Sequence, residues 1–421
     1  MKKTLIKNIG RLITVSSNSE LKKGHKMNEL TDLKNAWLKI ENDRILDFGS
    51  MEKWTGIDNW NEFNIIDAEK GTVLPSWCDS HSHIVYAGSR EQEFVDKING
   101  LSYEEIAKKG GGILNSSLIL KDTSEEDLYT QSMKRIHEVI KGGTGAIEIK
   151  SGYGLDTEQE MKMLRVIKKI KETSSITVKS TFLGAHAIPK KYKESPDQYV
   201  EIVINEMIPK IAKEELADYI DVFCDKGFFT AKQTEKILQA GLNYGLKGKI
   251  HANELAFSGG IQVGVKMGAI SVDHLEFTSN EEIECLKESK TIPTLLPSTA
   301  FFLGLIYPPA RKMIDSGLPI ALASDYNPGS SPSGNIEFIM SLACIKLKMT
   351  PEEAINALTI NGAHAMELQN DLGSIEKGKV ANLIITEKLP SNAFIPYSFG
   401  RSLIKKVIIQ GKLYNDCNTN N

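Results

Sequence analysis

Eight short apolar runs, separated by longer amphipathic stretches, set the strongest limit on the fold of this chain. Apolar runs that alternate with helical patterns are typical of βαβ units, and therefore of a parallel sheet. The runs span residues 72–81, 145–151, 176–186, 219–229, 247–254, 269–277, 291–298 and 319–325. Eight such units, in about the length that a closed barrel requires, predict an α/β chain built on a (β/α)8 TIM barrel rather than an open doubly wound sheet.

The stretches between the runs carry the period of amphipathic helices. In residues 157–172, four apolar side chains recur at helical spacing. Asp156 or Thr157 is the predicted N-cap of this helix, and Glu160 stands where it could complete a capping box. Further helices are predicted over residues 125–141, 197–212, 230–244 and 351–368.

Both ends of the chain differ from its middle. Residues 1–70 contain short β-prone pieces separated by Asn, Asp, Gly and Ser clusters, and residues 373–421 return to strands and turns. Isolated strands cannot bury a core, so we expect the two ends to join in one small β-sandwich domain. The predicted organisation therefore has a barrel over residues 71–372, flanked by the N-terminal and C-terminal parts of that β-sandwich domain.

Charge and cysteine content narrow the classes of function. The 421 residues carry a formal net charge of -3, which gives no reason to expect a nucleic acid or an anionic membrane as a partner. No apolar run approaches the length of a membrane span. The five cysteines are odd in number and scattered, as expected for reduced thiols in a cytoplasmic protein. We expect a small-molecule substrate; a homodimer is compatible with the sequence, which does not specify the oligomeric state.

Five of the eight histidines fall at the predicted carboxyl ends of barrel strands, where the catalytic groups of this fold lie. His81 and His83 are one residue apart, so an extended strand would point both imidazoles to one face. His186 follows the third run, His251 lies in the fifth and His274 in the sixth. The alternative, unrelated core or surface histidines, requires a coincidence of position.

A metal site follows from these positions. His81, His83, His251 and Asp325, which ends the eighth run, form a ligand set that leaves room for a water molecule. Imidazole and carboxylate ligands suit zinc or iron, so we expect one divalent or trivalent ion. Water bound to such an ion reaches a pKa of about 7 and supplies hydroxide at neutral pH.

Three residues are predicted to be catalytic. Glu254 lies three residues after His251, can turn back toward the same water, and is the predicted general acid/base. His274 is expected to polarise a carbonyl oxygen, and Asp325 to hold the hydroxide. The alternative for Glu254 is a surface carboxylate in a loop.

Several stretches resemble those of a known family. Together with the histidines and Asp325, the sequence resembles the amidohydrolase superfamily and, within it, the imidazolonepropionase family. The closer resemblance rests on YAGSR at 86–90, KSGYG at 150–154, LGAHAIP at 183–189 and NPGSSP at 327–332. It implies metal-dependent hydrolysis of the cyclic amide bond of 4-imidazolone-5-propanoate to N-formimidoyl-L-glutamate, a step of histidine degradation.

The resemblance also implies substrate-binding residues. Arg90 would pair with the propanoate, because a planar guanidinium suits a carboxylate, and Tyr153 would lie beside it. The residues implied to contact the ring or its polar substituents are His186, Asn327, Gly329 and Ser330. Tyr103 is a weaker candidate. The alternative for Arg90 is a surface ion pair with Glu91 or Glu93.

Some positions depart from the family pattern or separate its branches. Lys226 stands at the end of the fourth run, where binuclear relatives carry a carboxylated lysine that bridges two ions, and we favour a mononuclear site in which Lys226 is structural. Ser76, Asn253 and Asn382 differ from the residues expected there, and Tyr326 is a further position that could reshape the wall of the pocket. They leave every ligand in place and bear only on substrate preference.

Two other functions stay open at this point. A mononuclear purine or pyrimidine deaminase of the guanine or cytosine type uses the same arrangement, although a neutral base needs no carboxylate clamp such as Arg90. A non-catalytic barrel could also act as a binding scaffold, but the retention of every predicted ligand argues against that interpretation.

Overall fold

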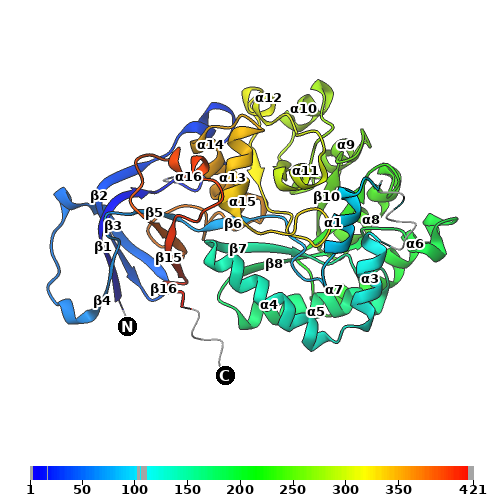
Figure 1. The fold of residues 1–421 in the computed structure, drawn as a ribbon, viewed down its shortest axis with the longest axis horizontal. Helices are drawn as coiled ribbons and strands as arrows, with labels where there is room; N and C mark the ends of the chain where they lie inside the picture. The colour runs from blue at the N-terminus through cyan, green and yellow to red at the C-terminus, as the bar shows by residue number, and fades with distance from the viewer. Residues whose placement is uncertain (1–2, 17, 102–104, 106–110, 416–421) are drawn as a thin grey trace.

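The computed structural model describes residues 3–16, 18–101, 105 and 111–415 (Figure 1). The middle of the chain forms a barrel of eight parallel strands, each paired with the next along the chain. These strands are β6 (Trp77–Asp79), β7 (Thr144–Lys150), β8 (Thr177–Ala185), β9 (Tyr219–Cys224), β10 (Lys247–Ala252), β11 (Ser271–His274), β12 (Ile292–Leu295) and β13 (Ala321–Leu322). The eight predicted runs are therefore the eight strands of the barrel.

Backbone contacts just beyond the first and last strands close this barrel. Ser82 and Tyr326 form a parallel bridge. The N–H of Asp325 donates to the carbonyl of His81 at 2.9 Å, and the N–H of His83 donates to the carbonyl of Tyr326 at 2.9 Å. These contacts involve predicted metal ligands beside the first and the last strand, and they therefore fix the spacing between those ligands.

Helices surround the strands, as the amphipathic stretches predict. Their apolar faces pack with the strands in one large buried cluster. The α-helices are α1 (Glu91–Ile98), α3 (Ile113–Asp122), α4 (Glu125–Lys141), α5 (Thr157–Thr173), α6 (Pro196–Ile202), α7 (Ile208–Lys213), α8 (Ala231–Asn243), α9 (Gly260–Lys266), α10 (Asn280–Lys287), α11 (Pro297–Leu303), α12 (Ala310–Asp315), α13 (Ile336–Ile345), α14 (Pro351–Leu358), α15 (Ile360–Ala365) and α16 (Phe394–Tyr397).

Two predicted helices are interrupted. A π-helical turn, Val203–Met207, separates α6 from α7. Pro209 follows this turn and has no N–H to donate to the preceding turn, which is a known cause of such interruptions. The predicted helix over 351–368 is also divided, because Thr359 leaves helical geometry with φ -119° and ψ -91° between α14 and α15.

The predicted cap of α5 is half right. Asp156 is the N-cap, and its side chain accepts the N–H of Gln159. Glu160 does not complete a capping box. Its carboxylate instead accepts the N–H groups of Gly154 and Leu155 at 2.7 and 2.9 Å and that of Gly152 at 3.1 Å. Glu160 therefore fastens the loop before the helix.

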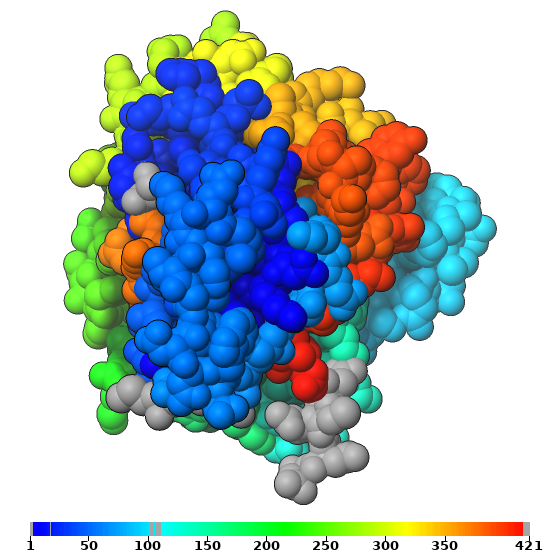
Figure 2. Space-filling view, turned by 90° about the vertical axis from the view of Figure 1, so that its left-hand side faces the viewer, coloured from blue at the N-terminus to red at the C-terminus, as the bar shows by residue number. Residues whose placement is uncertain are grey.

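The two ends of the chain join, as predicted, and they do so in one mixed sheet with its own apolar core. Its strands are β1 (Lys3–Ile13), β2 (Asp32–Glu41), β3 (Arg44–Ser50), β4 (Phe63–Asp67), β5 (Thr72–Pro75), β14 (Leu383–Thr386), β15 (Ile404–Ile409) and β16 (Lys412–Leu413). Strand β14 joins the ends by pairing antiparallel with β5. Figure 2 shows the last strands, in red, beside the blue N-terminal residues.

The first predicted run belongs to both sheets. Residues 72–75 form β5 in the terminal sheet, and residues 77–79 form β6 in the barrel. Ser76 lies between them and donates its N–H to the carbonyl of Asn382. A single apolar run thus carries the chain from one core into the other. Among the described residues, no helix has the length and apolarity needed to cross a membrane.

Candidate active site

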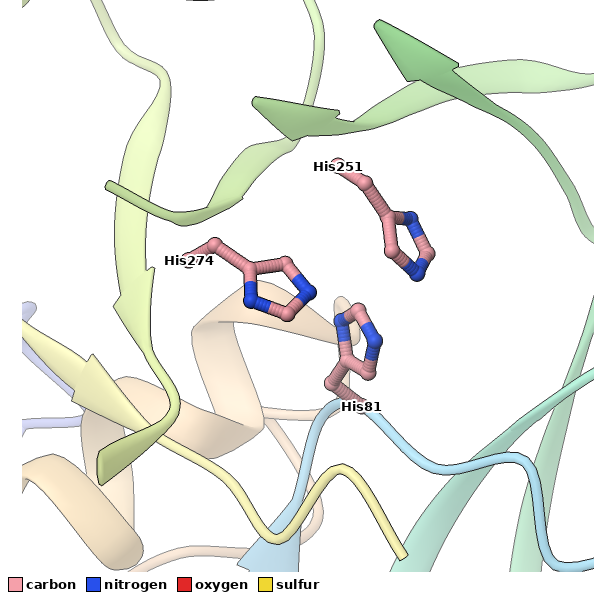
Figure 3. Close-up of side chains that lie close together, drawn as sticks. All are labelled: His81, His251 and His274. Carbon is pink, nitrogen blue, oxygen red and sulfur yellow. The ribbon is translucent and has the colours of Figure 1, made fainter. Parts of the chain in front are cut away.

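The predicted ligands meet at the carboxyl end of the barrel. His81 and His83 follow β6, His251 lies in β10, His274 ends β11, and Asp325 follows β13. Each of these five residues is at most 3% exposed. Figure 3 shows the rings of His81, His251 and His274 turned toward a common point. The closed barrel therefore gathers residues that are up to 244 positions apart in the sequence.

The predicted ligands fall into two overlapping groups, and within each group the ligand atoms lie close enough to hold an ion. The Nε2 atom of His83 is 3.3 Å from Nε2 of His81 and 3.3 Å from Nε2 of His251. The Oδ1 atom of Asp325 is 3.5 Å from Nε2 of both His81 and His83. A second overlapping group joins His81 and His251 to His274. His274, predicted only as a catalytic residue, therefore also stands within reach of an ion.

The protonation of the imidazoles fits a metal ion. Nδ1 of His81 is 2.6 Å from Oδ2 of Asp273, and Nδ1 of His251 is 3.0 Å from Oδ2 of Asp221. A proton on each Nδ1 leaves the Nε2 atoms with lone pairs. Burial lowers the pKa of His81 and His83 well below the usual range, so these rings are neutral. Buried lone pairs that face one another need a cation between them, and carboxylate-supported imidazoles are typical metal ligands.

Thr299 orients the carboxylate of Asp325. Its hydroxyl, on α11, donates to Oδ2 of Asp325 at 2.5 Å, which leaves Oδ1 to face the histidines. Burial raises the pKa of Asp325 to about 6, although this hydrogen bond opposes the rise. Sequence reasoning missed Thr299, because nothing in a Ser-Thr-Ala stretch after the seventh strand distinguishes it from an ordinary helix start.

Glu254 lies next to the ligand cluster. Its Oε2 atom is 3.7 Å from Nε2 of His274, and the residue is 7% exposed. Burial, followed by the charges of Asp325 and Asp225, raises the pKa of Glu254 well above its usual range. A carboxyl group with a raised pKa holds a proton more readily than an exposed one, which suits a residue that carries a proton during a reaction. The backbone of His274 is held at φ +83°, a conformation that side chains rarely adopt and that occurs often at functional sites.

A cavity of about 810 Å³ opens above these residues. This volume suits a small organic molecule. Its floor includes His83, His251, His274, Asp325 and Glu254, and its apolar wall includes Ile113, Phe223, Phe228, Phe301, Phe302 and Leu305. The six predicted substrate-binding residues, Arg90, Tyr153, His186, Asn327, Gly329 and Ser330, all line the same cavity. Tyr103 lies outside the described residues.

Arg90 faces the cavity from the start of α1. Its Nε and Nη2 atoms donate to Oε2 of Glu93 at 2.9 and 2.6 Å, so one of the two expected ion-pair partners is present. The side chain is only 9% exposed, and the pair is therefore not a surface one. A Cβ atom at Gly329 would lie 2.0 Å from Nη1 of Arg90. Glycine at that position makes room for the guanidinium.

His186 and Tyr153 form part of the wall. Nδ1 of His186 donates to the carbonyl of Gly152 at 2.9 Å, which leaves Nε2 as an acceptor. Burial lowers the pKa of His186 to about 3, so the ring stays neutral. Its ring stacks on that of His83 with centroids 5.2 Å apart, and the Tyr153 ring lies 5.4 Å away on another side.

The loop after β13 is shaped by Asn327. The Oδ1 atom accepts the N–H groups of Gly329 and Ser330 at 2.8 Å, and Nδ2 donates to the carbonyl of Asp325 at 2.7 Å. Its amide is thus committed mainly to its own turn. Lys226 is exposed in the loop after β9, outside the buried ligand cluster.

Two of the positions expected to bear on substrate preference have structural roles. Asn253 donates to the carbonyl of Phe277 and accepts the hydroxyl of Ser258. Tyr326 packs against Tyr86 at the closure of the barrel. Neither is among the described residues that line the cavity, and the same is true of Ser76, which lies at the junction of the two sheets.

Sequence reasoning also missed a charged layer below the histidines. Strands that are buried on both faces normally read as continuous apolar runs. The charged residues of this layer lie on four of these strands, and they are Glu148, Lys150, Asp221, Lys249 and Asp273. Their alternate spacing, as in Glu148 and Lys150, was the available signal that they point into the barrel.

Known proteins resemble this chain along nearly its whole length. The model of the amidohydrolase family matches residues 72–414. A protein named imidazolonepropionase from Christiangramia forsetii is 59% identical over 410 residues, which cover 97% of this chain and 99% of the relative. The protein of the same name from Flavobacterium johnsoniae is 58% identical, with 97% and 99% covered.

Solved structures agree with the fold. E. coli guanine deaminase superposes with a TM-score of 0.72 at 14% identity and covers 99% of each chain. An adenosine deaminase from Xanthomonas campestris with bound zinc has a TM-score of 0.71 at 15% identity, with 98% of this chain and 92% of that chain covered. At such identities the similarity shows the fold alone.

Proposed function

This chain belongs to the amidohydrolase family, and on that premise we propose that it hydrolyses 4-imidazolone-5-propanoate to N-formimidoyl-L-glutamate, a ring-opening step of histidine degradation. Relatives that carry the name imidazolonepropionase at 41–59% identity support the proposal. The observation that carries it is the placing of Arg90, a carboxylate-binding group, in the same cavity as the buried histidines and Glu254.

The floor of the cavity supplies the chemistry. We propose that His81, His83, His251 and Asp325 hold one ion, zinc or iron, and that Lys226 has no part in it. Such an ion, when bound, acts as a Lewis acid and makes a water molecule more acidic. We propose that Asp325 also accepts a hydrogen bond from that water. The exposed position of Lys226 supports a mononuclear site.

Glu254 moves the proton. The water adds to the ring carbonyl carbon and gives a proton to the carboxylate of Glu254; the bond from that carbon to the ring nitrogen then breaks, and Glu254 returns the proton to the nitrogen. The position of its carboxyl group, with Oε2 3.7 Å from Nε2 of His274 beside the ligand cluster, supports this role. His274, whose Nε2 lies 3.7 Å from Glu254, is the group placed to polarise the carbonyl oxygen.

The wall of the cavity supplies recognition. Arg90 pairs with the propanoate, and Tyr153 lies on the same side. Nε2 of His186 is an acceptor for a ring N–H, because its Nδ1 proton is already donated to Gly152. We further propose that the reaction takes place in the cytoplasm, where the free thiols of Cys78, Cys224, Cys285 and Cys344 would stay reduced.

An assay of the purified protein tests the function. We expect loss of the imidazolone ring absorbance and formation of N-formimidoyl-L-glutamate without release of ammonia. Guanine and cytosine serve as controls, since a deaminase would release ammonia from one of them. Turnover of a base together with an inert imidazolone propanoate would overturn the proposal, and a folded, metal-containing protein that is inert toward all three would favour a binding scaffold.

A further inference from the structure

A layer of charged side chains fills the barrel below the histidines. Glu148 and Lys150 lie on β7, Asp221 on β9, Lys249 on β10 and Asp273 on β11, and each of these residues is at most 1% exposed. Taking five charges out of water is costly unless each one is paired. The pairing of these charges therefore makes the layer possible. Two of the paired carboxylates, those of Asp273 and Asp221, also contact proposed ligands.

Lys150 lies at the centre of this layer. Its Nζ atom is 2.7 Å from Oδ2 of Asp221, 3.6 Å from Oδ2 of Asp273 and 2.6 Å from Oε1 of Glu148. Although burial opposes it, the charges of these carboxylates hold the pKa of Lys150 well above its usual range. The ammonium group is accordingly a permanent charge in the core.

Two of these three oxygen atoms also face the histidines. Oδ2 of Asp273 is the atom 2.6 Å from Nδ1 of His81, and Oδ2 of Asp221 is the atom 3.0 Å from Nδ1 of His251. The second oxygen of Asp273 is held as well, because Oδ1 accepts the hydroxyl of Ser271 at 2.6 Å. One ammonium group thus joins the two carboxylates that orient two ligands from opposite sides of the barrel.

Carboxylates outnumber ammonium groups in and around this layer. Its three carboxylates and two ammonium groups leave one negative formal charge, and Asp325, ionised as a ligand must be, adds another. Further carboxyl groups, those of Glu254 and Glu276, are buried beside His274. The charge of the surroundings therefore favours a cation at the histidines.

We propose that Lys150 is a positioning residue of the metal site, which holds Asp221 and Asp273 so that His251 and His81 present Nε2 to a single divalent ion. Carboxylates behind metal-bound histidines fix the tautomer and the ring orientation. Without the ammonium group, two like charges in a dry core would repel and turn away from the imidazoles. The role concerns the metal, so it stands apart from the identity of the substrate.

The test compares two buried lysines in the full-length protein. Lys249 lies in the same layer and pairs with Glu148, but its other hydrogen bond goes to the carbonyl of Ser80 and not to a carboxylate behind a ligand. Lys249→Met is therefore a matched control for the loss of one buried charge. The zinc form of each variant is challenged with a chromophoric chelator, which reports the dissociation constant for Zn²⁺ without reference to activity.

We expect Lys150→Met to raise that constant by about 10- to 100-fold, the range found when partners of metal-bound histidines are removed. Lys249→Met should change it much less. The visible absorption of the Co²⁺ form, which reports ligand geometry, should shift only in the Lys150 variant. An unchanged constant in folded Lys150→Met, or equal increases in both lysine variants, would overturn the proposal, since equal increases would indicate net charge rather than position.

A second pair of variants covers a failure of Lys150→Met to fold. Lys150→Met combined with Asp273→Asn keeps the net charge of the layer and is compared with Asp273→Asn alone. Because Asp221 still loses its tie to the ammonium group, we expect a further weakening of Zn²⁺ binding of about tenfold. Equal dissociation constants in this pair would show that Lys150 does not position the ligands.

Discussion

The floor and the wall of the cavity are built in different ways. On the floor, the proposed ligands and Glu254 come from strands or the residues directly after them, and Asp273 and Asp221 lie against His81 and His251. On the wall, Arg90 begins a surface helix, Tyr153 lies in a loop, and Phe301 is 51% exposed. The barrel strands fix the geometry of the floor, whereas local contacts hold each wall residue in place.

Three residues provide these local contacts. Glu160 fastens the backbone on both sides of Tyr153, Asn327 shapes the turn after β13, and Gly329 leaves room for Arg90. Loops vary more readily than the scaffold that carries them. The difference implies that changes on the floor should abolish the chemistry, while changes on the wall should weaken recognition and leave the chemistry in place.

The largest effect is expected from His81→Ala, which removes a ligand from the floor. We expect about one divalent ion per native chain by elemental analysis, loss of that ion in the variant, and no measurable turnover. His364→Ala is a matched control, because His364 is a half-buried helix residue that bonds the carbonyl of Ser19. Two ions per native chain would contradict the mononuclear site and bring Lys226 back into consideration.

The next effect separates chemistry from metal binding. Glu254→Gln keeps the size of the side chain but cannot carry a proton, so kcat should fall by about 10²- to 10⁴-fold with the ion retained. The measurement is steady-state kinetics together with metal content. Near-normal kcat would place the proton transfer on another group, His274 or Asp325, and would break the assignment of roles on the floor.

The floor was largely predictable and its supports were not. Alternation along an extended strand places His81 and His83 on one face, and the parallel barrel collects strand ends, so these rules predicted which residues meet on the floor. Lys150 and Asp221 were missed because their contacts with one another and with His251 join different strands. Pairing between distant strands cannot be inferred from local pattern until the register of the barrel is known.

The wall was predicted mainly from resemblance, and its local structure less well. Glu160 was assigned to a capping box because its spacing from Thr157 fits one, but the chain caps the helix one residue earlier and leaves Glu160 free for the loop. The apolar run 72–81 likewise gave no signal that Ser76 separates two sheets. In both cases tertiary contacts decided between local alternatives.

A smaller loss is expected from the wall residue Arg90. Arg90→Met should lower kcat/KM by an amount equivalent to about 2 to 4 kcal/mol of transition-state stabilisation, because the substrate carboxylate would be left without its partner in a poorly hydrated cavity. Metal content should stay the same. Arg311→Met is the matched control, since Arg311 makes a comparable two-pronged pair with Glu353 away from the cavity. An unaltered kcat/KM in Arg90→Met would return Arg90 to a structural ion pair with Glu93.

The smallest effect concerns Glu160, which touches no ligand and lines no part of the cavity but fastens the loop that carries Tyr153. Glu160→Gln should raise KM by about tenfold or less and leave kcat and metal content nearly unchanged, because only recognition depends on that loop. An equal fall in kcat would mean that the loop also supports the floor, and the contrast between the two regions would fail.

The pH dependence of stability gives Glu160 an independent signature. Burial raises its pKa in the folded protein from 4.5 to about 7, against the opposing effect of hydrogen bonds from Ser151 and the loop N–H groups. Its contribution to stability is therefore complete below about pH 4.5 and is lost as pH rises through 7, a change of about 3 kcal/mol. Glu160→Gln should lack this component when unfolding is followed across that range. Glu282, a cap of α10 whose pKa is lowered despite burial, provides the opposite sign, because its contribution is lost as pH falls. If the native protein and Glu160→Gln lost stability in parallel between pH 5 and 7.5, the carboxyl group of Glu160 would not be the one that titrates.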